Sequence, residues 1–434
     1  MGEIIRHTYS VCPVCLKRIP AMHRAYGKEI YLEKTCPEHG DFSSIIWRGL
    51  RDMNTWRGDL PAIAEGEIGN CPHACGLCLE HQQDTCCVLL EVTKACNLHC
   101  SFCFAEGGKG EDIPFNIICE RLEGLVVPGK TLVQLSGGEP TLRNDLPEII
   151  ATAKDVGCQY VQLNTNGIRL GEDVQYVEKL AKAGLSFVFM QFDGMNDDIY
   201  RSLRGRNLLD IKKHAIENCA KYNIGVTLVP TIVPGVNTQD IGNIIRFAIS
   251  KAPAVRGVHL QPVSYFGRIP ALPSDDERFT LDELLQAIEE QAGEIIPWDS
   301  LLPSRCDHPL CGFHGDYIVM PNESLRPLHR LGNRSTNMTT AEHNRSFIAR
   351  KWQRPKTEEV VEYEFTQDES SFGSFDSFLS RLRSHSFTLT AMAFQDAGNI
   401  DLERLRRCSL HVYDDGKFIP FCAYYITRHE KTPS

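Results

Sequence analysis

Three cysteines in one short stretch restrict this chain more than any other feature. Cys96, Cys100 and Cys103 form a Cys-x3-Cys-x2-Cys pattern directly after an apolar run at 87–92. Three thiolates on one tight loop can hold three of the four irons of a [4Fe–4S] cube. No fourth cysteine follows at a matching spacing. The pattern therefore predicts a cluster with one open iron for a ligand. A zinc knuckle, the alternative, would lack its fourth ligand nearby.

A second motif follows some distance along the chain, and it also indicates ligand binding. Gly137 and Gly138 precede Glu139 and a proline at the end of an apolar run. Glycines at such a position let backbone approach a ligand closely, and the carboxylate of Glu139 can accept a hydrogen bond from a ligand amine. Phe102 adds an aromatic side chain within the cysteine motif.

These motifs together resemble the radical SAM superfamily. The resemblance implies that S-adenosylmethionine (SAM) chelates the open iron through its amino and carboxylate groups. It further implies that an electron from the cube splits a C–S bond and yields a 5′-deoxyadenosyl radical. In this chain the resemblance assigns the catalytic cluster to Cys96, Cys100 and Cys103, and SAM contacts to Phe102, Gly137, Gly138 and Glu139.

Eighteen cysteines among 434 residues are the anomaly of the composition. The N-terminus has no charged-then-apolar signal and no apolar run is long enough to span a bilayer, so we expect a cytoplasmic protein. In a reducing compartment, clustered cysteines indicate metal sites rather than disulfides. Fourteen cysteines fall into such clusters, and the other four (Cys87, Cys119, Cys158 and Cys219) are expected to be small buried side chains. The formal charge of −10 argues against nucleic-acid binding.

The first cluster lies in an N-terminal module expected at residues 1–60. Cys12 and Cys15 form one knuckle, and Cys36 and His39 form another about twenty residues later. This spacing predicts a metal site on a small ribbon. The fourth ligand is His39 or a cysteine from elsewhere, and spacing does not distinguish zinc from a single iron.

The next segment, 61–86, repeats the Cys-x3-Cys-x2-Cys pattern, now with a further cysteine in reach. Its spacing predicts a fully ligated auxiliary [4Fe–4S] cluster on Cys71, Cys75, Cys78 and Cys86. Cys87 competes with Cys86 as the fourth ligand, and a second structural zinc site is the alternative. A cluster with no open iron could carry electrons but could not bind SAM.

The region 296–434 contains the last four clustered cysteines. Cys306 and Cys311 lie in one loop, whereas Cys408 and Cys422 lie near the C-terminus. We expect a second auxiliary cube on these four thiols if the end of the chain folds back. Two solitary thiols and a loop pair are the alternative.

Between these regions, residues 87–295 alternate strand-like and helical patterns. Six strands are predicted at 88–92, 132–135, 160–163, 187–191, 225–230 and 258–262, and five helices at 145–156, 173–183, 208–222, 238–250 and 281–291. Helical crossovers between strands imply a parallel sheet, and six repeats suggest an α/β fold with a partial (β/α)6 barrel. Ligands should gather at the carboxyl ends of its strands. By position, Asn164 and Asn166 could bind the ribose, and Gln191 or Asp193 could touch the nucleoside or the substrate; simple turns are the alternative.

A basic run covers 326–356 in this otherwise acidic chain. It could meet a phosphate head group or an anionic membrane surface, which would give peripheral membrane contact, or it could be a solvated face. Residues 358–374 read as a linker, 377–384 as a helix, and 387–394 as an apolar stretch of either type.

The combination of modules resembles one group of the superfamily, which contains archaeal tetraether lipid synthase and relatives described as methylases of a 6-hydroxymethyl-dihydropterin. The resemblance implies a SAM cluster, two auxiliary [4Fe–4S] clusters, one mononuclear iron or zinc, and a ferredoxin- or flavodoxin-type reductant. Its main functional implication is hydrogen abstraction from unactivated carbons to join lipid alkyl chains. The alternatives are methylation of a dihydropterin or another modification of a small molecule. An electron-transfer or scaffold protein would need no SAM pocket.

Overall fold

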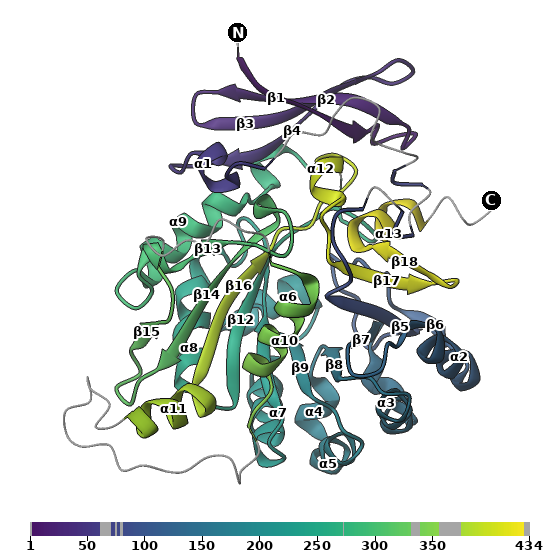
Figure 1. The fold of residues 1–434 in the computed structure, drawn as a ribbon, viewed down its shortest axis with the longest axis vertical. Coiled ribbons are helices and arrows are strands. Elements are labelled where there is room, and N and C mark those ends of the chain that lie inside the picture. Colours follow the sequence, from purple (N-terminus) through teal and green to yellow (C-terminus); the bar gives the residue numbers. More distant parts are fainter. Residues whose placement is uncertain are drawn as a thin grey trace.

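The computed structural model describes residues 2–60, 71–73, 76–78, 81–271, 273–330, 339–355 and 375–428. Two β-sheets organise these residues. A four-stranded antiparallel sheet lies at one end of the molecule, above a 14-stranded mixed sheet that forms its body (Figure 1). Among the described residues, no helix is both long and apolar enough to cross a membrane.

The N-terminal sheet is a meander of four strands. These are β1 (Glu3–Val11), β2 (Arg18–Tyr26), β3 (Glu29–Cys36) and β4 (Gly40–Arg48), paired in chain order. Side chains of β3 alternate between buried and half-buried positions, as in a strand with one face on a core. The short helix α1 (Met53–Arg57) follows, with Asp52 as its N-cap.

The central part of the large sheet is the predicted partial barrel. Its parallel strands are β5 (Cys87–Ala95), β7 (Leu132–Gly137), β8 (Tyr160–Thr165), β9 (Phe187–Gln191), β10 (Gly225–Val229) and β12 (Val255–Pro262). The predicted helices are present as α3 (Leu146–Asp155), α5 (Val174–Lys182), α7 (Leu209–Lys221), α8 (Ile241–Ser250) and α9 (Leu281–Ala292). The sequence did not reveal α2 (Phe115–Leu125), α4 (Ile168–Glu172), α6 (Asp197–Arg204), β6 (Lys109–Asp112) or β11 (Thr231–Ile232). The α/β prediction is confirmed, since β7 is buried along its whole length, as a covered parallel strand should be.

The C-terminal region extends this sheet at both edges. Beyond β12 lie the parallel strand β16 (Ser386–Met392) and the antiparallel strand β14 (Gly312–Val319), with β13 (Leu302–Pro303) and β15 (Leu325–Pro327) beside β14. Beyond β5 lie β17 (Leu410–Asp414) and β18 (Lys417–Pro420). The helices α11 (Phe375–Ser384), α12 (Leu402–Leu405) and α13 (Phe421–Thr427) connect or follow these strands. Residues 356–374, which include the predicted linker, lie outside the described residues.

Helix α10 (Ala341–Trp352) covers the amino-terminal ends of the barrel strands. The Trp352 ring packs against Phe187 and Phe189 of β9, with ring centroids 5.6 and 4.6 Å away. Arg256, near the start of β12, donates from Nε to the Lys351 carbonyl at 2.8 Å. The barrel is therefore closed below by α10, and its accessible end is at the carboxyl ends of the strands.

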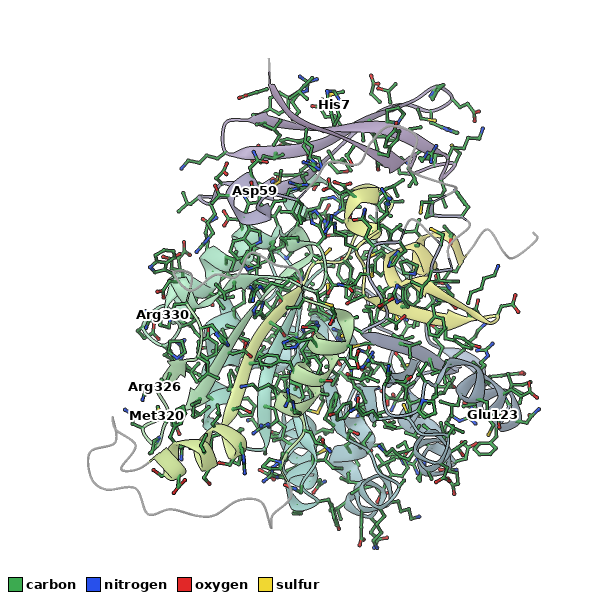
Figure 2. The ribbon with its side chains drawn as sticks, viewed as in Figure 1. His7, Asp59, Glu123, Met320, Arg326 and Arg330 are labelled. Atoms are coloured by element: carbon green, nitrogen blue, oxygen red, sulfur yellow. The ribbon has the colours of Figure 1, made fainter. Side chains whose placement is uncertain are left out.

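The basic run at 326–356 does not form one exposed face where the structure describes it. Arg345 is buried and donates to the Thr85 carbonyl at 2.9 Å. Arg354 donates to the Ala220 carbonyl at 3.0 Å. Other residues of the run are exposed, such as Arg326 on β15 and Arg330 just after it (Figure 2). These inward contacts give the run a packing role that the sequence did not indicate.

Candidate functional site

A cavity of about 1060 Å³ lies within the barrel. The three cysteines of the Cys-x3-Cys-x2-Cys loop line it together with the Gly-Gly-Glu motif, and so do strand-end residues from β8, β9 and β12. The cavity also reaches β14 and β16, beyond the six predicted strands. Segments that are distant in sequence therefore line one cavity.

The cysteine loop begins where β5 ends and is held by Arg268. The Arg268 side chain donates to the carbonyls of Cys100 and Gly107 at 2.9 and 3.0 Å. Its backbone and that of Cys103 exchange two hydrogen bonds of 3.0 Å. These bonds fix the loop over the cavity mouth without using a thiol.

Cys100 and Cys103 lie close enough to Cys96 to oppose the ionisation of its thiol. Burial, then the charges of Glu139, Cys100 and Cys103, raise the pKa of Cys96 to about 11. Several thiolates at one place need a compensating cation, since a buried like-charge group is unfavourable. The irons of a cluster would supply that charge, so this donor set fits the [4Fe–4S] group implied by the sequence.

The glycines of the second motif are required by the protein backbone itself. A Cβ on Gly138 would lie 2.1 Å from the Ala95 carbonyl oxygen, and one on Gly137 would lie 2.2 Å from that of Thr93. Gly137 also has a φ of +126°. The backbone amides of Gly138 and Glu139 donate to the carbonyls of Thr93 and Ala95, at the carboxyl end of β5, at 2.8 and 2.7 Å. The glycines thus allow a close approach between β5 and the motif, where the sequence suggested close approach to a ligand.

Glu139 is buried and organises the mouth of the cavity. Its Oε1 accepts hydrogen bonds from the Thr141 backbone and hydroxyl at 3.0 and 2.5 Å and from the Thr165 hydroxyl at 2.7 Å. Its Oε2 accepts from the Asn166 backbone at 2.7 Å. Oε2 thus receives one hydrogen bond where Oε1 receives three, so Oε2 is the oxygen with more room for the ligand amine that the sequence predicted.

The predicted strand-end polar residues divide into two groups. Asn164, Asn166 and Gln191 line the cavity, whereas Asp193 is fully buried outside it. Arg204 Nε and Nη2 donate to the two oxygens of Asp193 at 2.8 and 2.7 Å. The prediction that Asp193 touches a ligand is therefore corrected. Its carboxylate forms a buried ion pair with Arg204 of α6 instead.

Two basic residues that the sequence did not single out support these strand ends. Arg204, on α6, lines the cavity and lies beside Cys100. Burial lowers the pKa of Arg204, but the charge of Asp193 and then that of Cys100 outweigh burial and raise this pKa above its usual value. Lys212, on α7, is fully buried and donates from Nζ to the carbonyls of Asn166 and Gln191 at 2.7 and 2.6 Å. No local pattern identifies such residues, since their partners lie on other elements.

The auxiliary cysteines are arranged differently from the two predicted quartets. Cys86 Sγ lies 3.7 Å from Cys87 Sγ, and Cys86 packs in one buried group with Cys306, a residue expected in the other cluster. Ser409, just before β17, links the two segments, because its carbonyl accepts from the Cys86 backbone at 2.8 Å and its own amide donates to Asp307 Oδ1 at 2.7 Å. Cys86 and Cys306, which the sequence assigned to different clusters, therefore lie in one group. Cys87 packs against this group and is not an isolated buried residue.

The remaining members of both sets are placed as follows. Burial, then the charges of Asp307, Cys422 and Cys311, raise the pKa of Cys408. The thiols of Cys311, Cys408 and Cys422 are therefore within electrostatic range of one another. Cys71 is buried and Cys78 exposed, and both line one small pocket, whereas Cys75 lies outside the described residues. Cys158 and Cys219 are buried in the core as predicted, and Cys119 is half-buried.

The N-terminal ribbon carries the metal site that its spacing predicted. The ligand atoms of Cys12, Cys15, Cys36 and His39 all lie within 4.8 Å of one another. His39 Nδ1 is 3.6 Å from Cys12 Sγ and 3.4 Å from Cys36 Sγ. Burial would raise the pKa of the Cys12 thiol, but backbone amides of Cys15 and Val14 outweigh it and lower that pKa. Three thiols and one imidazole in this arrangement fit a four-coordinate zinc ion, with His39 as the fourth ligand.

Two family profiles match this chain. The one described as "Radical SAM superfamily" matches residues 90–248, and the one described as "HMPTM N-terminal zinc ribbon domain" matches residues 4–48. The first match covers β5 to α8, which carry the cysteine loop and the Gly-Gly-Glu motif. The second covers the ribbon and favours zinc there over iron.

Several named proteins are similar in sequence. The 7,8-dihydro-6-hydroxymethylpterin dimethyltransferase of Methanocaldococcus jannaschii is 34% identical over 96% of this chain and 93% of its own length. A "Probable GTP 3′,8-cyclase" of Sulfolobus acidocaldarius is 33% identical over 40% of this chain and 56% of its own. An Fe-coproporphyrin III synthase of Methanosarcina barkeri is 33% identical over 46% of this chain and 49% of its own. This chain therefore belongs to the radical SAM superfamily, and within it to the family that contains the M. jannaschii dimethyltransferase.

Proposed function

We propose that this radical SAM enzyme methylates a dihydropterin. The observation that carries the proposal is the likeness, over nearly the whole of both chains, to a protein named for that reaction. The cavity supports it, since a space of about 1060 Å³ suits a cofactor together with a second small molecule. Polar side chains of β12, β14 and β16 line that cavity, as a polar ring system requires.

The residues of this chain would have distinct tasks in that reaction. Cys96, Cys100 and Cys103 would hold the cluster, and Glu139 Oε2 would accept from the SAM amine. When bound, the cluster supplies the electron that cleaves SAM to a 5′-deoxyadenosyl radical. Asn164, Asn166 and Gln191 would orient ligands at the strand ends, where Lys212 holds two of their carbonyls. Helix α10 would exclude water by closing the barrel at the amino-terminal ends of its strands.

The auxiliary thiols belong to the same proposal. Cys86, Cys87 and Asp307 line the cavity itself. A cluster held by thiols at this wall would lie beside the substrate and could exchange electrons with it. The expectation of lipid chain coupling, by contrast, receives no support from the relatives named above, whereas the alternative of a pterin methylase does.

The test is product analysis with anaerobically reconstituted protein, SAM and a reductant. One reaction receives 6-hydroxymethyl-7,8-dihydropterin and another receives a membrane lipid extract. We expect 5′-deoxyadenosine together with a pterin that has gained the mass of one or two methyl groups. Two lipid chains joined with loss of two hydrogens, and no change in the pterin, would overturn the proposal.

A matched pair of variants tests the cysteine loop in the same assay. Cys100→Ala should abolish formation of 5′-deoxyadenosine, because Cys100 is a proposed cluster ligand. Cys119→Ala should leave it unchanged, since Cys119 lies on α2 away from the cavity lining. Equal activity of the two variants would contradict the assignment of the loop.

A further inference from the structure

The cavity has a wall that the six predicted barrel strands do not provide. Strand β16 pairs with β12, and β14 pairs with β16, so the sheet continues around the cavity. Asp316 of β14 pairs with Thr388 of β16, which pairs with Gly257 of β12. The same row continues through Thr227 to Phe189 of β9. Asp316 therefore stands level with the middle of the barrel strands, below the strand-end residues of the SAM site.

Asp316 is a buried acid whose carboxylate has no hydrogen-bond or ion-pair partner among the residues that the structure describes. It is 5% exposed and lines the cavity. Within the described ranges, its carboxylate makes no hydrogen bond and no ion pair within 4.0 Å. A buried carboxylate is unfavourable unless hydrogen-bonded, so its oxygens are available to a ligand in the cavity.

Nearby basic groups do not neutralise Asp316 by contact. Burial lowers the pKa of Lys351 on α10, and the charge of Asp316 acts in the opposite direction. Burial likewise lowers the pKa of His314, two residues from Asp316 along β14, again against the charge of Asp316. His314 also lines the cavity. The Asp316 carboxylate thus interacts electrostatically with Lys351 and His314 without hydrogen-bonding to either. Its oxygens can therefore accept hydrogen bonds from a ligand.

Aromatic faces lie next to this acid. Trp352 Nε1 donates to the Thr388 hydroxyl at 3.0 Å, and Thr388 is the residue opposite Asp316. Phe189 lies 4.6 Å from the Trp352 ring and 5.5 Å from the ring of His259. All of these side chains line the cavity. A flat ring can stack against such faces while its edge reaches the carboxylate.

A carboxylate offers two acceptor oxygens side by side, which match a ligand edge with two adjacent N–H donors. A 2-amino-4-oxopyrimidine ring has such an edge, formed by its 2-amino group and N3–H. We propose that Asp316 binds this edge of the substrate ring and so selects 2-aminopyrimidinone substrates. The inference rests on the proposed function, since a dihydropterin contains this ring, and it identifies Asp316 as a specificity residue rather than a catalytic one.

The experiment measures binding to the reconstituted protein in the presence of SAM and without reductant. The probes are 6-hydroxymethyl-7,8-dihydropterin and its analogue that lacks the 2-amino group. We expect wild-type protein to bind the first probe at least 10-fold more tightly than the second. In Asp316→Asn that preference should disappear, and affinity for the amino-bearing probe should fall by about 10- to 100-fold, as expected for loss of a paired charged acceptor.

Asp276→Asn is the matched control, because Asp276 is exposed on a surface turn. SAM affinity and thermal unfolding of both variants should equal those of wild type, which separates ring recognition from a folding defect. If wild type binds the pterin and Asp316→Asn keeps the same preference, the role of Asp316 is wrong while the proposed function stands. If wild-type protein binds neither probe, the proposed function fails and this inference fails with it.

Discussion

Gly138 lies against the end of β5, where a side chain has no room. A Cβ there would meet the backbone of both Ala95 and Lys94 at under 3.0 Å. Backbone atoms cannot rotate away as a flexible side chain can. The Gly-Gly-Glu motif is therefore constrained by its own chain before any ligand binds.

We expect Gly138→Ala to lower the free energy of unfolding by about 2–4 kcal/mol, because overpacking must displace β5 or the motif. It should also weaken SAM binding, since Glu139 moves with the motif. Chemical denaturation and SAM titration measure the two effects. Gly108→Ala is the control in the same region, as a Cβ there has no neighbour within 4 Å. Equal stability of the two variants would contradict the packing argument.

His259 is a titratable residue of the cavity wall. Burial lowers its pKa to about 4, and its Nδ1 lies 2.8 Å from the Thr390 hydroxyl. An exposed histidine in the unfolded chain has a pKa of about 6.5. The folded protein therefore keeps His259 neutral where the unfolded chain takes up a proton.

The stability contributed by this difference is present above about pH 6.5 and is lost as the pH falls towards 4. We expect wild type to lose about 1–2 kcal/mol from this residue between pH 7 and 5. His259→Gln should show a correspondingly smaller decrease over the same range, measured by urea denaturation at each pH. An unchanged slope would show that His259 is already solvated in the folded state.

At the scale of elements, helix α12 joins the ribbon to the large sheet through buried acids. Glu403 accepts hydrogen bonds from Arg6 Nε and Nη2 at 2.8 Å each and from Arg57 of α1. Asp401, the N-cap of α12, accepts from the Thr8 hydroxyl at 2.7 Å and contacts His23 Nε2 at 2.9 Å. Burial would raise the pKa of Asp401, but His23 and Thr8 outweigh it and hold that pKa well below its usual range.

Glu403→Gln should lower the free energy of unfolding by about 3 kcal/mol, since it leaves the Arg6 and Arg57 charges without their buried partner. Equilibrium denaturation measures this. Glu33→Gln removes a comparable pair with Arg24 that is partly exposed, and it should cost less than about 1 kcal/mol. Similar losses in both variants would show that the α12 contact is no stronger than a surface ion pair.

At the scale of the whole molecule, the ribbon metal site and the auxiliary cysteines are physically connected. The metal site closes the two hairpin turns of the ribbon, and a module of this size depends on its metal to fold. The ribbon neutralises Asp401 and Glu403, and α12 leads directly into the chain that carries Cys408. Loss of the metal would leave two acids of α12 without their partners.

Selective removal of the ribbon metal, by Cys15→Ser, should therefore reduce the iron content of the auxiliary clusters proposed above, while the SAM cluster is retained. Iron content per chain and the SAM-dependent spectrum of the cluster measure the two separately. Cys119→Ala serves as the control for loss of a thiol. Full auxiliary iron content in Cys15→Ser would show that the ribbon and α12 act independently.

What the sequence by itself determined is the local chemistry. Ligand spacing identified the three-cysteine loop and the ribbon site, and period and run length identified the six barrel strands, because these signals depend on neighbours in the chain. The tertiary structure decided which distant groups meet. The pairing of β17 with β5 brings Cys86 near Cys306. Arg204 of α6 forms an ion pair with Asp193, and the pairing of β14 with β16 places Asp316 in the cavity wall. Such contacts depend on strand order, on register and on how neighbouring elements pack, which no local pattern encodes.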